Sequence, residues 1–162
     1  MNALTYAAAA VIEDDAGRVL LCQQSHGHRL WALLGGKIRD GESPTRAVRR
    51  DVYEETGSEI EIVDLVGLYQ VTGGADLPDL LVHVFRARLR SGEATLNAPS
   101  RICRLAWHDP RTLPTPTTPT ARAAIADAVR DRSGVLREVR RDPEPVYTET
   151  AAATPMGAAV VS

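Results

Sequence analysis

The chain has 162 residues, 44% of them hydrophobic, which is enough for one domain with its own core. A formal net charge of −2 excludes the global positive field that draws proteins to nucleic acid. Two cysteines are too few for a disulfide framework, and no apolar run approaches the roughly 20 residues of a membrane span, so we expect a cytoplasmic protein without membrane or nucleic-acid partners.

The first third of the chain predicts three strands. Residues 5–12 form an apolar run typical of a buried strand, and residues 18–23 return as a second strand after a turn. Residues 30–34 predict a short third strand.

A helix is predicted to follow Ser43. This serine suits an N-cap, and Pro44 suits the first helical position, where its missing N–H costs nothing. The run from Thr45 to Thr56 contains neither glycine nor proline, and Gly57 suits a left-handed C-terminal cap.

Three carboxylates share one arc of this predicted helix. At about 100° per residue, Asp51, Glu54 and Glu55 fall within roughly 100° of one another. Carboxylates this close repel each other and have raised pKa values unless a cation neutralises them. Mg²⁺ and Mn²⁺ prefer oxygen ligands of this kind. The arc therefore predicts a divalent metal site.

The alternative is a salt-bridged surface helix, which also places Glu and Arg three and four residues apart. The preceding segment argues against it. Gly35, Gly36 and Gly41 bracket a tight loop, and Glu42 lies eight residues before Arg50. We expect this loop to fold back so that Glu42 reaches Arg50, a geometry that a surface helix would not require.

At these positions the chain resembles the Nudix hydrolase family. The family signature runs Gly, five residues, Glu, seven residues, Arg-Glu, an aliphatic residue, any residue, Glu-Glu, any residue, Gly and an aliphatic residue. It is matched in register by Gly36, Glu42, Arg50, Val52, Glu54, Glu55 and Gly57. Weaker likeness extends over residues 4–132. The resemblance implies an α+β fold with a mixed β-sheet sandwiched between helices, an α/β/α arrangement.

Two positions depart from the signature. Asp51 stands where the family has the Glu after Arg, and the missing methylene pulls its carboxylate back by about 1.5 Å. A misplacement near 1 Å can lower a rate on the order of a hundredfold, which puts catalytic efficiency in question. Ser58 replaces the closing aliphatic residue.

The resemblance implies a Mg²⁺-dependent pyrophosphohydrolase that cleaves a phosphoanhydride bond in a nucleoside diphosphate derivative or nucleoside triphosphate. Glu54, Glu55 and the Gly36 carbonyl would bind Mg²⁺, with Mn²⁺ as the alternative ion. Asp51 would bind metal or orient the attacking water.

Supporting roles follow from the same resemblance. Glu42 and Arg50 would pair and lock the loop onto the helix. Lys37 and Arg39 would contact phosphate oxygens of the substrate, although solvated loop cations are an equally good interpretation of both.

The rest of the chain predicts three strands, at residues 59–71, 80–89 and 101–107, and a helix that begins after Thr118 and runs to about Arg132.

These elements complete a predicted domain over residues 1–134. Residues 135–162 are charged and then rich in Ala, Thr and Pro. We expect a disordered or loosely docked tail, and contact with a second copy in a homodimer is the alternative.

Several polar residues outside the signature are weaker candidates. His26 and His28 lie in a loop that is placed to rim a pocket, although exposed histidines without a role are more common. A further metal ligand or general base is sought among four residues of the later segments, Tyr69, Asp76, Asp79 and Glu93.

Two other functional classes are compatible with the sequence. One is a nucleotide-binding module with weakened turnover, which Asp51 favours and the retained Glu54-Glu55 pair disfavours. The other is an isomerase or a repair glycosylase, because one fold hosts unrelated chemistries. The length leaves no room for an extra DNA-binding domain, which disfavours a glycosylase. The sequence does not select the nucleotide.

Overall fold

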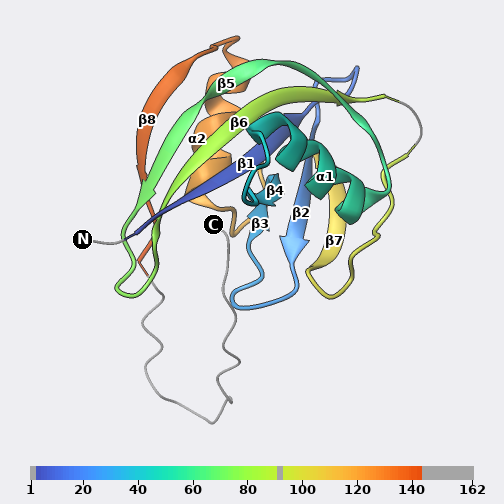
Figure 1. Ribbon diagram of the computed structural model, residues 1–162. Coiled ribbons are helices and arrows are strands. Elements are labelled where there is room, and N and C mark those ends of the chain that lie inside the picture. The colour runs from blue at the N-terminus through green and yellow to red at the C-terminus, as the bar shows by residue number, and fades with distance from the viewer. Residues whose placement is uncertain (1–2, 91–92, 144–162) are drawn as a thin grey trace.

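The computed structural model describes residues 3–90 and 93–143. In chain order the elements, labelled in Figure 1, are β1 (Leu4–Ile12), β2 (Val19–Gln24), β3 (Trp31–Ala32), β4 (Leu34–Lys37), α1 (Pro44–Thr56), β5 (Ile60–Thr72), β6 (Asp79–Leu89), β7 (Ile102–His108), α2 (Pro119–Val129) and β8 (Val135–Arg140).

The strands of the described residues form two sheets. The larger sheet has the order β4-β1-β6-β5-β8, and the smaller one has the order β3-β2-β7. In the larger sheet β1 runs parallel to β6 and antiparallel to β4, while β5 runs antiparallel to β6 and parallel to β8. The larger sheet is therefore mixed, as expected.

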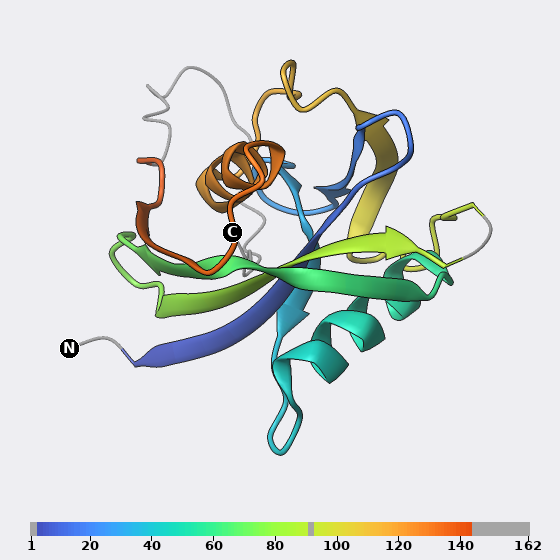
Figure 2. The ribbon, with the colours of Figure 1, turned by 90° about the horizontal axis from the view of Figure 1, so that it is seen from above.

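The two helices cover opposite faces of the larger sheet. Successive residues of a strand point to opposite faces, so Ala7 and Ala9 of β1 join the core beside α2, whereas Ala8 and Ala10 join the core that contains Val48 of α1. Figure 2 shows the two helices on either side of the strands. This confirms the predicted α+β fold with its α/β/α layers.

Helix α1 has the predicted caps. The Ser43 hydroxyl accepts a hydrogen bond from the Arg46 N–H at 3.2 Å, and Gly57 adopts the left-handed conformation with φ of 69°. Val48 and Val52 are fully buried and hold the helix on the sheet. Neither helix in the described part of the chain is long and apolar enough to cross a membrane.

The predicted third strand is in fact two strands in different sheets. Trp31–Ala32 pairs with β2, whereas Leu34–Lys37 pairs with β1. The glycine pair expected in a loop is thus part of β4. A Cβ at Gly35 would lie 2.2 Å from the Ala8 carbonyl oxygen, so only glycine allows these two strands to approach this closely.

The prediction of a disordered or loosely docked tail over residues 135–162 was wrong for residues 135–140. Residues Val135–Arg140 form strand β8 at the edge of the larger sheet, so the domain does not end at residue 134. A Cβ at Gly67 would lie 2.4 Å from the Val135 carbonyl oxygen, and the bare glycine backbone therefore gives β8 room to pair. The part of the expected tail from residue 144 onward lies outside the described residues.

Helix α2 is shorter than predicted. It begins after the expected cap, since the Thr118 hydroxyl accepts from the Ala121 N–H at 3.2 Å, but it ends at Val129 rather than near Arg132.

Candidate functional site

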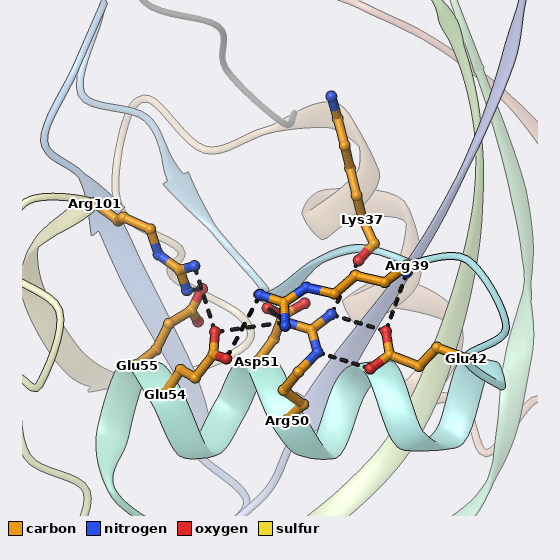
Figure 3. A network of polar contacts seen from close by, with 8 residues as sticks. All are labelled: Lys37, Arg39, Glu42, Arg50, Asp51, Glu54, Glu55 and Arg101. Carbon is orange, nitrogen blue, oxygen red and sulfur yellow. Dashed lines mark hydrogen bonds and ion pairs between the residues drawn. The ribbon is translucent and has the colours of Figure 1, made fainter.

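An ion pair closes the loop before α1. Arg50 Nε donates to Glu42 Oε2 at 2.7 Å and Arg50 Nη2 donates to Glu42 Oε1 at 2.9 Å, a bidentate geometry. Arg50 Nη2 also donates to the Lys37 carbonyl at 3.2 Å. The Arg50 guanidinium lowers the pKa of Glu42 to about 2. The predicted contact between Glu42 and Arg50 is confirmed, and Figure 3 shows it beside the acidic residues of the helix.

Three carboxylates of α1 lie next to this pair. Asp51 and Glu55 are buried, with 3% and 5% of their surface exposed, whereas the Glu54 side chain is 37% exposed. Asp51 Oδ1 accepts from Arg50 Nη1 at 2.9 Å, and Glu55 Oε1 accepts from Arg101 Nη2 at 2.9 Å. The predicted acidic arc is therefore formed, with guanidinium groups as its partners (Figure 3).

One oxygen on each buried carboxylate is left over. Asp51 Oδ2 and Glu55 Oε2 have no hydrogen-bond partner among the described residues. Burial raises the pKa of the Asp51 carboxyl, and it raises the pKa of Glu55 to about 8 although Arg101 opposes the shift. Buried polar atoms are nearly always paired in proteins, and carboxyls with raised pKa values gather at functional sites. These two oxygens mark α1 as a candidate site.

Gly36 brings the backbone of β4 against this site. A Cβ at residue 36 would lie 2.8 Å from Asp51 Oδ2, so a side chain here would displace the carboxylate. The glycine of the signature is thus required by space. Its carbonyl as a metal ligand stays a prediction.

The two buried carboxylates, Asp51 and Glu55, open onto a cavity of about 370 Å³. Charged side chains from four segments line it, namely Lys37, Arg39, Arg50, Asp51, Glu55 and Arg101. Apolar groups such as Leu33 and Val82 also contribute, together with Thr118 and Thr120 at the start of α2. The Thr120 hydroxyl is buried and without a partner among the described residues. A cavity that combines charged and apolar linings suits a ligand with an anionic part and a less polar part.

Of the weaker sequence candidates, one lines this cavity and the others do not. His26 lines it, and its Nε2 lies 2.7 Å from the Ser100 carbonyl oxygen. Tyr69 was a wrong candidate, because it is fully buried and its hydroxyl donates to Asp127 at 2.9 Å in the core beside α2. Within the described residues, the cavity lining does not include His28, Asp76, Asp79 or Glu93.

Sequence reasoning missed Arg101 and the two threonines. Arg101 lies 46 positions after Glu55, immediately before β7, and is brought to the site by the pairing of β7 with β2. Nothing local to residue 101 indicates this contact. Thr118 was recognised only as a helix cap, and its place in the cavity depends on the packing of α2 against the larger sheet.

The donor chemistry of the site fits a hard divalent cation, since its unpaired atoms are carboxylate oxygens. Among the described residues, however, no group of three or more His, Cys, Asp or Glu side chains is arranged to bind one metal ion. The carboxylates form ion pairs with guanidinium groups instead. Arg39, Arg50 and Arg101 each lie within ion-pair distance of Glu54.

A model of the NUDIX domain matches residues 3–128 of the chain. The chain belongs to the NUDIX family. Residues 36–57, which carry the signature, lie inside the matched segment, and the resemblance inferred from the sequence is confirmed.

Several proteins match part of the chain in sequence. The chain is 34% identical over 103 residues to the oxidized purine nucleoside triphosphate hydrolase of Danio rerio, covering 61% of this chain and 63% of that protein. It is 28% identical to a putative 8-oxo-dGTP diphosphatase of Bacillus subtilis, covering 76% and 78%. The chain spans less than two thirds of the first two curated relatives. It covers 63% of the Danio rerio protein and 41% of a MutT-like protein of Streptomyces ambofaciens.

Solved structures extend the comparison. The crystal structure of a MutT NUDIX hydrolase from Burkholderia pseudomallei has 30% sequence identity and a TM-score of 0.72, and the match covers 76% of this chain and 97% of that one. The α+β fold described above therefore matches that of a solved NUDIX hydrolase.

Proposed function

We propose that this NUDIX protein is a Mg²⁺-dependent pyrophosphohydrolase that cleaves a phosphoanhydride bond in a purine nucleoside triphosphate. The observation that carries the proposal is the pair of unpaired carboxylate oxygens, Asp51 Oδ2 and Glu55 Oε2, on the wall of the cavity. Two relatives named for oxidised purine nucleoside triphosphates support the choice of substrate class.

Glu54, Glu55 and Asp51 are the residues proposed to hold the cation, which when bound neutralises the diphosphate and lowers the pKa of water. Arg50 orients Asp51 through the 2.9 Å hydrogen bond and fixes the loop through Glu42. This is how a surrounding residue keeps a metal ligand in position.

The chain's own cations would bind the substrate's phosphates. Lys37 and Arg39 both line the cavity, and the Lys37 ammonium extends away from the acidic residues in Figure 3. Lys37 would therefore meet a phosphate at the mouth of the cavity rather than neutralise the carboxylates.

A second candidate, a nucleotide-binding module with weak turnover, is favoured by one observation. Asp51 is shorter than the family's Glu, and its Oδ1 is already bound by Arg50 at 2.9 Å. A carboxylate held back in this way would retain nucleotide affinity and lose rate.

The deciding experiment is a screen for phosphate or pyrophosphate release. It would use ordinary and 8-oxo purine nucleoside triphosphates, pyrimidine nucleotides and nucleoside diphosphate derivatives, each with Mg²⁺ or Mn²⁺ or with chelator. The wild type is compared with Glu54→Gln and Asp51→Glu, and with Arg111→Gln as a control, since Arg111 is exposed and forms an ion pair with Asp109.

We expect cation-dependent release from a purine nucleoside triphosphate, loss of turnover in Glu54→Gln, and maintained or increased turnover in Asp51→Glu. Full activity of Glu54→Gln would remove this residue from the mechanism. A fall in Asp51→Glu would show that the site is built around the shorter side chain. Tight nucleotide binding without release would favour the binding module.

A further inference from the structure

The guanidinium of Arg101 stands where a cation would bind the acidic residues. Its Nη2 lies 2.9 Å from Glu55 Oε1 and its Nη1 lies 3.7 Å from Glu54 Oε2. Figure 3 shows Arg101 reaching these two glutamates from the side opposite to Glu42. A single guanidinium thus bridges two of the three carboxylates that the proposed function assigns to the metal.

Arg101 differs from Arg50 in how firmly it is held. The Arg50 side chain is 19% exposed and donates to Glu42, Asp51 and the Lys37 carbonyl. The Arg101 side chain is 46% exposed, and its guanidinium contacts Glu54 and Glu55. A guanidinium fixed by a bidentate pair and a carbonyl stays in place, whereas the half-exposed Arg101 can leave once another cation takes its place beside the buried Glu55.

The backbone of Arg101 is fixed while its side chain is not. The Arg101 N–H donates to the Ala98 carbonyl at 3.0 Å, and the Arg101 carbonyl accepts from the Ser25 N–H at 3.0 Å. Departure of the guanidinium from the carboxylates therefore needs only a change of side-chain rotamer, and the group would remain at the cavity that it already lines.

The charge balance favours such an exchange. Glu42, Asp51, Glu54 and Glu55 form ion pairs with the three guanidiniums of Arg39, Arg50 and Arg101. When all are ionised and Arg101 leaves, four carboxylates face two guanidiniums. The deficit of two charges matches one divalent cation. Arg101 contacts both Glu54 and Glu55, whereas the more exposed Arg39 contacts Glu54 alone, so Arg101 is the guanidinium that the cation would replace.

We infer that Arg101 is an internal counter-ion that exchanges the Glu54 and Glu55 carboxylates for a phosphate of the substrate when the divalent cation binds. The inference rests on the proposed function and assigns a second role at the same site. A guanidinium binds phosphate oxygens with two parallel hydrogen bonds, so the group displaced from the carboxylates has a new partner in the incoming nucleotide.

The inference predicts opposite changes in two affinities of Arg101→Ala, for the divalent cation and for the nucleotide, and each is measured separately. Removing the competitor should tighten Mn²⁺ binding to the nucleotide-free protein, on the order of tenfold, as followed by electron paramagnetic resonance of free Mn²⁺. Removing the phosphate partner should weaken binding of a non-hydrolysable purine nucleoside triphosphate analogue in saturating Mn²⁺, also on the order of tenfold, as followed by calorimetry.

Two further variants separate this exchange from a structural effect. Arg104→Ala removes the same charge three residues along β7 and should change neither affinity. Arg101→Lys keeps the charge without the planar fork, so it should bind Mn²⁺ about as weakly as the wild type while recovering only part of the affinity for the analogue. Thermal melting with added Mn²⁺, compared with melting in chelator, should show that Mn²⁺ stabilises Arg101→Ala more than it stabilises the wild type.

The failures are distinguishable. Unchanged or weaker Mn²⁺ binding in Arg101→Ala, with normal binding by the wild type, overturns the counter-ion role and leaves the proposed function standing. Tighter Mn²⁺ binding with unchanged affinity for the analogue overturns the exchange to phosphate. No Mn²⁺ binding by any variant overturns both the inference and the proposed function.

Discussion

Two buried aspartates with arginine partners lie in the two layers of this molecule, and they are satisfied to different degrees. Asp127 of α2 is 2% exposed, and Asp51 of α1 is 3% exposed. Asp127 receives hydrogen bonds at both oxygens, from Tyr69 and Arg137 at Oδ2 and from Arg132 and Arg137 at Oδ1. Asp51 receives one at Oδ1, and Oδ2 is unpaired among the described residues.

The pKa directions follow the pairing. The Arg137 guanidinium lowers the pKa of Asp127 to about 2, whereas burial raises the pKa of Asp51. Both residues are acidic, buried and next to arginine, so burial and charge alone do not identify a site. The unpaired oxygens on a cavity wall make the difference. Asp127 joins α2 to β5 and β8, and the α1 carboxylates are left open to a ligand.

The largest expected effect that tests this contrast is in Glu55→Gln. A neutral amide cannot replace a carboxylate that neutralises a metal, which is worth several kcal/mol, so we expect turnover to fall on the order of a thousandfold. Stability should not fall, because the variant removes a buried charge with an unpaired oxygen. Steady-state kinetics and thermal melting of the same preparation measure both. Loss of stability in step with activity would contradict the distinction.

Asp127→Asn should show the opposite pattern. Losing the charge leaves Arg132 and Arg137 without their shared partner, and because these arginines are half-exposed we expect a loss of about 2 kcal/mol in the free energy of unfolding. This corresponds to a melting temperature lower by about 6 °C. Denaturant titration measures the loss, and kcat should stay within about twofold of the wild type. A large fall in kcat at full stability would make Asp127 part of the functional site.

Glu42→Gln tests the ion pair of Glu42 with Arg50. This pair is fully hydrogen-bonded, like Asp127, but it lies beside the candidate site, like Asp51. Without the Glu42 carboxylate, Arg50 loses its bidentate partner, is held less firmly and orients Asp51 less well. We expect Mn²⁺ affinity to fall on the order of tenfold, as measured by calorimetry. Glu59→Gln is a matched control, because the ion pair of Glu59 with Arg90 is long, at 3.9 Å, and exposed. Equal effects in the two variants would refute a positioning role for Glu42.

The smallest expected effect is the acid dependence of the Asp127 contribution. Its pKa is lowered from 3.8 to about 2 in the folded state, so its stabilisation is present above about pH 4 and is lost as the pH falls toward 2. Between about pH 4 and pH 3 the stability difference between wild type and Asp127→Asn should narrow by about 1 kcal/mol. Urea titrations at both pH values measure it. A constant difference would show that the carboxylate titrates normally.

The amino-acid sequence alone determined the features that depend on neighbouring residues. The caps at Ser43 and Gly57, the acidic arc of α1 and the reach of Glu42 to Arg50 all follow from helix periodicity and a short loop. The spacing of the signature residues within 22 positions indicated the family, and the resemblance to the family predicted the α/β/α layers. Local backbone geometry leaves little freedom at these distances, so pattern and structure agree.

Only the tertiary structure decided which distant residues meet. Arg101 reaches Glu55 through strand pairing, β8 joins the sheet at Gly67, and Tyr69 turns to Asp127 instead of the cavity. None of these contacts has a local signal, because a strand of given pattern can pair with any other strand edge. Long-range pairing is chosen by the whole core at once, and it determined which buried carboxylates were satisfied and which remained open.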